Sequence, residues 1–166
     1  MSDCCSNGPS AQVADPKARC PQCGVVGKPV STLTLKHIVK PQFLETVDAT
    51  DFTFCPSADC DLVYFHPNGV RLAKADVRVR VGLKETEDPV PICYCFGFTE
   101  AMARDEIRAT GKCTIPDRIS AEMRRGLCAC EVRNPQGSCC FANVSALVKR
   151  LLPSKPKPIP PIPVTR

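Results

Sequence analysis

The sequence predicts an α+β protein, with a small antiparallel sheet in its first part and short helices in its second. Val77, Val79 and Val81 alternate with arginines, which is the period of a strand with one buried face. After Pro91 the pattern changes to helical spacing between capping residues. We therefore expect two lobes that meet near residues 86–91.

Two further runs in the first lobe are typical of strands. FTF at 52–54 and LVYF at 62–65 are rich in aromatic and β-branched residues. Together with the alternating segment they predict the sheet.

Three helices are expected in the second lobe. Thr99 is a candidate N-cap for a helix over 100–109, and Gly111 lies just beyond that helix. A second helix ends at Gly126. A third begins near Ser138, because apolar residues then recur at helical spacing: Phe141, Val144, Leu147, Val148 and Leu151.

Neither end of the chain is expected to pack. Residues 1–19 read as a flexible arm that carries Cys4 and Cys5, because large apolar side chains are few there. Residues 153–166 form a proline-rich tail, whose composition favours extended backbone without internal hydrogen bonds. The expected organisation is arm 1–19, β lobe 20–90, helical lobe 91–152 and tail 153–166.

Cysteine is the most informative residue type. The 166 residues include 13 cysteines and no tryptophan. The N-terminus has no apolar run typical of a secretory signal, and no stretch approaches the roughly 20 apolar residues of a membrane span. We therefore expect a cytoplasmic protein that is not embedded in a membrane. In a reducing compartment, a cysteine-rich pattern favours metal over disulfides.

The net charge of +5 does not indicate nucleic-acid binding. It is accounted for by the C-terminal basic residues Lys149, Arg150, Lys155, Lys157 and Arg166, so the body of the chain is neutral. A broad basic face, which phosphate binding needs, is not predicted. Hydrolytic catalysis has little support either, since His37 and His66 are the only histidines and neither lies in a catalytic motif.

The first cysteine set predicts a zinc site. Cys20 and Cys23 lie in CPQC, and Cys55 and Cys60 lie in CPSADC, each pair bracketing a tight turn beside strand-like sequence. Two facing turns can present four thiolates tetrahedrally, as a closed structural zinc site requires. The alternative is a pair of hairpins with reduced or disulfide-linked cysteines. Four thiolates leave no coordination position for a substrate, so catalysis at this metal is not expected.

The second cysteine set favours an iron-sulfur cluster. Cys93 and Cys95 form a CxC pair, and LCACEVRNPQGSCC offers four further candidates: Cys128, Cys130, Cys139 and Cys140. A CxC pair is unusual in zinc ribbons, whereas a cluster with two irons accepts varied spacings. The alternatives are a second zinc site and a redox disulfide. Spacing alone does not select four ligands from six cysteines.

The order and spacing of several motifs resemble the N-terminal zinc and 2Fe-2S domain of the CopZ-type copper metallochaperones. The part after the CxC pair is also similar to cluster domains of the bacterioferritin-associated ferredoxin type. The resemblance covers about residues 20–145. The matching motifs are CPQC at 20–23, FTFCPSADCDLVYF at 52–65, RVRVGLKETEDPVPICYC at 78–95, TEAM at 99–102 and NPQGSCC at 134–140.

The resemblance implies the ligands of both centres. It assigns zinc to Cys20, Cys23, Cys55 and Cys60. It assigns the 2Fe-2S cluster to Cys93, Cys95, Cys130 and Cys140, with Cys139 as the alternative to Cys140. Cys113 and Cys128 then have no ligand role.

The resemblance also implies a function in copper handling. We expect a metallochaperone or redox accessory, not an enzyme, that can reduce Cu(II) to Cu(I) with an electron from a reductase. Its expected partner is a copper-exporting P-type ATPase or a separate protein with a heavy-metal-associated domain, since in longer family members such a domain follows. Cys4 and Cys5 are a candidate transient Cu(I) site. The alternatives are an electron carrier with no copper role and a zinc-only interaction module.

Overall fold

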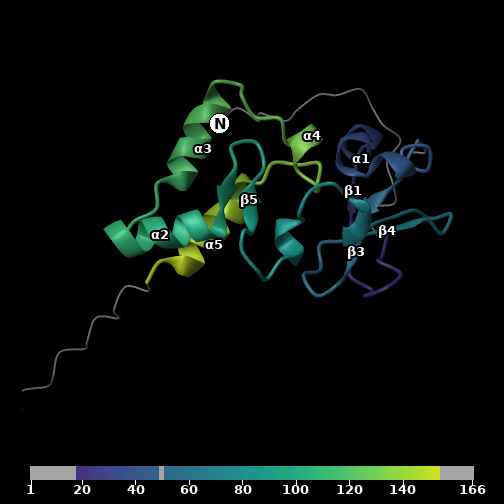
Figure 1. The fold of residues 1–166 in the computed structure, drawn as a ribbon, viewed down its shortest axis with the longest axis horizontal. Coiled ribbons are helices and arrows are strands. Elements are labelled where there is room, and N and C mark those ends of the chain that lie inside the picture. The colour runs from purple at the N-terminus through teal and green to yellow at the C-terminus, as the bar shows by residue number, and fades with distance from the viewer. Residues whose placement is uncertain (1–17, 49–50, 154–166) are drawn as a thin grey trace, which may run out of the picture.

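The computed structural model describes residues 18–48 and 51–153 as an α+β fold. Figure 1 shows the sheet and helix α1 at one end, helices α2, α3 and α5 with strand β5 at the other, and helix α4 between them. The predicted arm and tail, with Cys4 and Cys5, lie outside the described residues. The lobe limits at 20–90 and 91–152 stay a prediction.

The first region contains an antiparallel sheet of four short strands. Their spatial order is β1 (Lys28–Pro29), β2 (Thr53–Phe54), β3 (Leu62–Phe65) and β4 (Arg71–Ala73). Thr53 pairs with Phe65 and Phe54 with Tyr64 between β2 and β3. The strands predicted at 52–54 and 62–65 are therefore confirmed. All four residues of β3 are buried, because both faces of this central strand are covered.

Helix α1 (Thr32–Ile38), which contains His37, was not predicted. Ser31 begins this helix: its Oγ accepts a hydrogen bond from Thr34 N at 3.2 Å. Leu35 and Ile38 then lie on the buried face of the helix. A serine N-cap followed by apolar residues three apart was the local signal for this element.

The strand predicted from the alternation at Val77–Val81 was wrong, although the burial pattern was right. Val77 and Val81 are buried, but Val77 makes only an isolated bridge with Val39. The neighbouring Arg78 instead bonds the end of α1. Its N donates to Ile38 O at 2.8 Å, and its side chain donates to Lys36 O and Val39 O. The segment therefore closes the end of a helix, and the 3-10 helix η3 (Gly82–Lys84) follows it. Two further 3-10 turns lie earlier in the chain, η1 (Pro41–Phe43) and η2 (Lys74–Asp76).

The second region begins with a two-stranded hairpin, β5 (Pro91–Cys93) and β6 (Phe98–Thr99). Helix α2 (Glu100–Thr110) has Thr99 as its N-cap and Gly111, with φ of 72°, as its C-cap. Helix α3 (Ile115–Arg124) ends two residues before Gly126. Both predicted helices are confirmed.

Two helices complete the second region. Helix α4 (Cys130–Arg133) is a single turn that was not predicted, and α5 (Phe141–Leu151) begins three residues later than expected. Cys140 is the N-cap of α5. Among the helices in the described parts of the chain, none combines the length and apolar character needed to cross a bilayer.

Two apolar cores lie in the two regions, and polar contacts join them. Thr34 Oγ1 on α1 donates to Glu131 O on α4 at 2.6 Å, and Tyr64 Oη on β3 donates to Pro135 O at 2.6 Å. Both bonds are between residues more than 70 positions apart in sequence. The loop after α4 is thus packed against the sheet region. The first core contains Val30, Leu35, Ile38, Val39, Val47, Phe52, Phe54, Val63, Tyr64, Leu72, Val77 and Val81.

Candidate metal centres

Four cysteines converge in the sheet region. The Sγ atoms of Cys20, Cys23, Cys55 and Cys60 all lie within 4.8 Å of one another, which is the spread of donors around a single ion. Cys20 and Cys60 are 3.8 Å apart, and Cys23 and Cys55 are 3.6 Å apart. Within the described residues, this is the single group of three or more candidate ligands so arranged.

Local backbone structure brings the two pairs together. The CPQC turn closes with Gly24 N donating to Cys20 O at 2.9 Å, and Gly24 adopts a φ of 74°. The second pair flanks the turn between β2 and β3, where Cys55 N donates to Val63 O. Leu62 and Phe65 pack with the buried cysteines as a small apolar cluster. Only Cys23 of the four is exposed.

The environments of the four thiols differ. A hydrogen bond from the Val25 backbone lowers the pKa of Cys23 to about 7. Burial raises the pKa of Cys55 to about 12 and also raises that of Cys60. The Cys55 and Cys60 thiols therefore keep their protons in the metal-free protein, and a divalent ion that binds them displaces those protons. A set of four sulfur donors, three of them on buried residues, fits a structural zinc ion.

A second group of thiols lies where the β5–β6 hairpin meets α4 and α5. Cys95 Sγ and Cys130 Sγ are 3.6 Å apart, and Ala129 N donates to Cys95 Sγ at 3.2 Å. Cys140 lies close enough to Cys93 and Cys130 to lower the pKa values of both thiols. The structure thus brings together the four cysteines that the family resemblance selects.

Protons are shared unequally within this second group. The hydrogen bond from Cys140 lowers the pKa of Cys93 to about 7 and that of Cys130 to about 6, whereas the pKa of Cys140 is raised. Burial raises the pKa of Cys95 to about 12. Cys93 and Cys130 are therefore the thiols of this group that lose their protons most readily. The crowding of these sulfurs is relieved when a cation takes the place of the protons.

The sulfur atoms of the second group are arranged differently from those of the first. Within the described residues, no three of its sulfurs converge around one point as the four of the first group do. A cluster with two irons needs a wider donor set than one ion, so the arrangement fits a 2Fe-2S cluster better than a second zinc. Cys139 is half-buried and also interacts with Cys130, so it remains the alternative fourth ligand.

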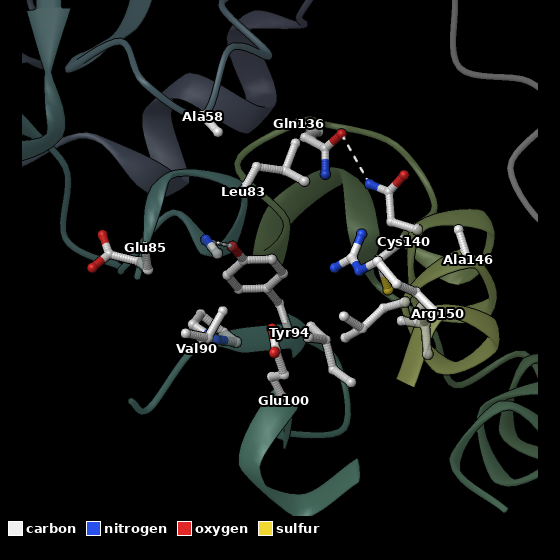
Figure 2. A pocket seen from close by; sticks show the side chains of 16 residues that line it. Ala58, Leu83, Glu85, Val90, Tyr94, Glu100, Gln136, Cys140, Ala146 and Arg150 are labelled. Atoms are coloured by element: carbon white, nitrogen blue, oxygen red, sulfur yellow. Dashed lines mark hydrogen bonds between the residues drawn. The ribbon is translucent and has the colours of Figure 1, made fainter. Parts of the chain in front are cut away.

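Two cavities reach this second group. One, of about 410 Å³, has Cys140 on its wall, and the other, of about 390 Å³, reaches Cys93. Figure 2 shows the Tyr94 ring inside the first cavity, with Leu83 above it and Arg150 beside it. Tyr94 lines both cavities, and its Oη accepts a hydrogen bond from Gly82 N at 2.8 Å. The CxC loop is thereby held against η3.

His37, His66 and Cys113 make side-chain contacts with other groups. His37 bonds the Leu33 carbonyl within its own helix, and His66 Nδ1 accepts a bond from Asn68 N in a turn. Cys113 Sγ contacts the Glu106 carboxylate at 3.7 Å. None of these three side chains belongs to a described metal site.

Comparison with known proteins agrees with this geometry. A family model described as a zinc binding domain matches residues 17–78, the stretch that holds the Cys20, Cys23, Cys55 and Cys60 group. The X-ray structure of the Archaeoglobus fulgidus CopZ N-terminal domain is similar, with a TM-score of 0.66 and 34% sequence identity. The match covers 78% of this chain and 97% of that domain. The chain belongs to the CopZ N-terminal domain family.

A curated member of the CopZ family gives the same result. The copper chaperone CopZ of Archaeoglobus fulgidus is 35% identical to this chain over 129 residues, or 78% of the chain. The alignment spans 61% of the length of that relative. The zinc site of the CopZ N-terminal domain family is thus formed here by the converging quartet of the sheet region.

Proposed function

We propose that this chain is a zinc- and 2Fe-2S-containing metallochaperone or redox accessory in copper handling, active in the cytoplasm. The observation that carries the proposal is that the chain has two cysteine groups whose sulfur atoms are arranged differently. One fits a single zinc ion and the other has paired sulfurs on converging elements. The name of the curated relative, a copper chaperone, supports copper as the cargo.

The zinc site supplies structure in this proposal. Its sulfurs are provided by two turns of the sheet region, and three of the four cysteines are buried. A closed set of four thiolates has no place for a substrate, so this centre holds the CPQC turn against the sheet.

The second group supplies the redox function. Cys93, Cys95, Cys130 and Cys140 would hold a 2Fe-2S cluster, which when bound exchanges one electron at a time. The Ala129 N–H donates to Cys95 Sγ, and the Arg133 guanidinium bonds the Cys95 carbonyl at 3.2 Å. Such contacts stabilise negative charge on the sulfur donors and favour the reduced state.

Copper is the substrate of the proposed reaction. Cu(II) gains one electron to become Cu(I), a soft ion that prefers thiolate ligands, and a reductase returns the electron to the protein. Cu(I) then passes to a copper-exporting ATPase or to a protein with a heavy-metal-associated domain. Cys4 and Cys5, outside the described residues, stay a predicted transient Cu(I) site.

Metal and sulfide analysis of protein purified without oxygen tests the two-centre proposal. We expect one zinc, two irons and two sulfides per chain, with visible absorption. Cys95→Ala and Cys140→Ala should lose iron and absorption but keep zinc. Cys113→Ala, a cysteine of the same region outside both groups, is the matched control and should keep both metals. Two zincs and no iron would leave a zinc-only interaction module.

The copper step is tested separately. The reduced protein, freed of excess reductant, is mixed with Cu(II) and a colorimetric Cu(I) chelator. We expect about one Cu(I) per cluster from the native chain, as one-electron exchange requires, and none from Cys95→Ala. A reduced cluster that leaves Cu(II) unchanged would instead indicate a general electron carrier with no copper role.

A further inference from the structure

Lys84 is buried beside the first cysteine group. Among the described residues, it is the one lysine, arginine, aspartate or glutamate whose side chain is buried, with 4% exposure. Its Nζ donates to Ser57 O at 2.6 Å and to Cys60 O at 2.9 Å, both in the CPSADC turn. The ammonium therefore lies against the turn that presents two of the four zinc ligands.

No carboxylate of the described residues forms an ion pair with this ammonium. The adjacent Glu85 pairs instead with Arg80 at 2.7 Å and with Lys74 at 3.9 Å. Across the described parts of the chain, no acidic side chain lies within 4.0 Å of Lys84 Nζ. The Phe54 ring, 5.9 Å away, contributes only a weak cation–π contact. A buried charge without a partner is strongly unfavourable, so its counter-charge must lie nearby.

The cysteine group beside this turn can supply the negative charge. Four thiolates around one divalent zinc ion carry a formal excess of two negative charges, in a site where three of the four cysteines are buried. Lys84 lies beside this group, because its Nζ bonds the backbone carbonyl of one of the four cysteines, Cys60. The two unfavourable buried charges thus offset each other.

We propose that Lys84 is the resident counter-ion of the zinc centre, which stabilises the four-thiolate form and lowers the nucleophilicity of its sulfurs. The inference rests on zinc occupancy of the first site, and it concerns a positioning residue that does not itself ligate the metal. With their negative charge offset by Lys84, the four thiolates hold zinc as a permanent structural ion. Without the ammonium the sulfurs would be more electron-rich and more readily attacked.

A role as a simple tether is the competing explanation, because Lys84 also bonds two carbonyl oxygens. Three substitutions separate charge from tethering. Lys84→Arg keeps the charge, Lys84→Gln keeps amide donors for the carbonyls without the charge, and Lys84→Met keeps only the apolar stem. Lys36→Met is the matched control, since Lys36 is an exposed lysine of the same region, paired with Asp48 at 2.5 Å.

The experiment measures two properties of the zinc-loaded chains. The first is zinc affinity, by competition with a chromophoric chelator. The second is the rate of zinc release when iodoacetamide alkylates the sulfurs, a reaction in which an S–C bond forms and iodide leaves. The zinc content of the native chain is measured in the same samples. A native chain without zinc would refute the zinc site itself, whereas a zinc-loaded native chain with unaffected variants would refute only the role of Lys84.

We expect Lys84→Gln and Lys84→Met to bind zinc roughly tenfold more weakly and to release it roughly tenfold faster on alkylation, as removal of a unit charge at close range implies. Lys84→Arg and Lys36→Met should stay close to the native values. Equal behaviour of Lys84→Gln and Lys84→Arg would overturn the proposal and leave a tether. Should Lys84→Met fail to fold, this comparison still decides the question.

Discussion

At the scale of single residues, Glu106 joins two helices through one carboxylate. Its Oε1 accepts hydrogen bonds from Thr114 N at 2.8 Å and from Thr114 Oγ1 at 2.6 Å, which ties α2 to the start of α3. These bonds hold the pKa of the Glu106 carboxyl below its usual range. The ionised form is therefore favoured by folding.

The Glu106 contact predicts a pH-dependent stability difference. Because the folded pKa is lowered, its contribution is full above the unfolded glutamate pKa of about 4.3 and is lost as the pH falls through the lower folded value. The stability gap between the native chain and Glu106→Gln should thus shrink on acidification. Urea unfolding at several pH values measures it, with exposed Glu131→Gln as the control. A gap independent of pH would contradict this account.

At the scale of elements, the contact between η3 and the β5–β6 hairpin depends on Gly82, which has no side chain. A Cβ added to Gly82 would lie 1.9 Å from Pro91 O and 3.4 Å from Tyr94 Oη. Tyr94 stands between two candidate cluster ligands, Cys93 and Cys95. A glycine is needed here because the backbone of η3 approaches that of β5 closely.

We predict that Gly82→Ala displaces the hairpin and lowers the iron content of the protein while zinc is kept. Overpacking at such a contact typically costs about 1–3 kcal/mol. Gly111→Ala is the control, since a Cβ there meets nothing within 4 Å although φ is 72°. It should cost about 1 kcal/mol and leave iron unchanged. Metal analysis and urea unfolding report both effects, and full iron content in Gly82→Ala would refute the close-contact explanation.

Helices with clear ends in the sequence were predicted correctly, although α1 was missed despite its serine N-cap, and a segment that depends on distant partners was predicted wrongly. Helix α2 has its own cap residues, Thr99 and Gly111, at both ends. The segment at Val77–Val81 has the alternation of a strand, yet its polar groups bond the end of α1, about 40 positions earlier in sequence. Only the folded chain brings these two segments together.

Some residues of the candidate sites could likewise be predicted from the sequence, and others could not. The spacing of CPQC and CPSADC was enough to predict the converging quartet, because each pair lies in one turn. The choice between Cys139 and Cys140 could not be made from spacing, since adjacent residues differ only in direction. Lys84 was missed entirely, because its contacts with Ser57 and Cys60 depend on how η3 packs.

At the scale of the whole molecule, the zinc ion is expected to stabilise the sheet region. The strands there are short, and the cysteines themselves form part of a small apolar cluster with Leu62 and Phe65. Zinc at about a hundred times its dissociation constant adds about 2.7 kcal/mol of stability.

We predict that a chelator under reducing conditions lowers the melting temperature by about 5–10 °C. Circular dichroism should show that helical signal from α2, α3 and α5 is lost last. Cys23→Ser, which lacks the exposed ligand, is the control and should respond little to chelator. An unchanged melting temperature in the native chain would mean that zinc does not contribute to the fold.

The bond from Tyr64 Oη to Pro135 O joins the two regions, and its removal should destabilise both. We predict that Tyr64→Phe lowers the free energy of unfolding by about 1–3 kcal/mol, because a buried carbonyl loses its donor. Thr110→Ala, which removes an exposed side-chain bond to Glu106 O, should cost less. Urea unfolding compares the two, and equal costs would argue against a special role for the buried bond.

The packing of residues 130–137 on α1 and β3 also bears on how the chain is made. The sheet region leaves the ribosome long before Glu131 and Pro135 are synthesised. Thr34 and Tyr64 therefore cannot form their hydrogen bonds to these residues until late in synthesis. The nascent sheet region is therefore left with an uncovered face until about residue 137 has emerged. Early zinc capture would protect this unfinished intermediate, and insertion of the second centre would follow once the later cysteines are available.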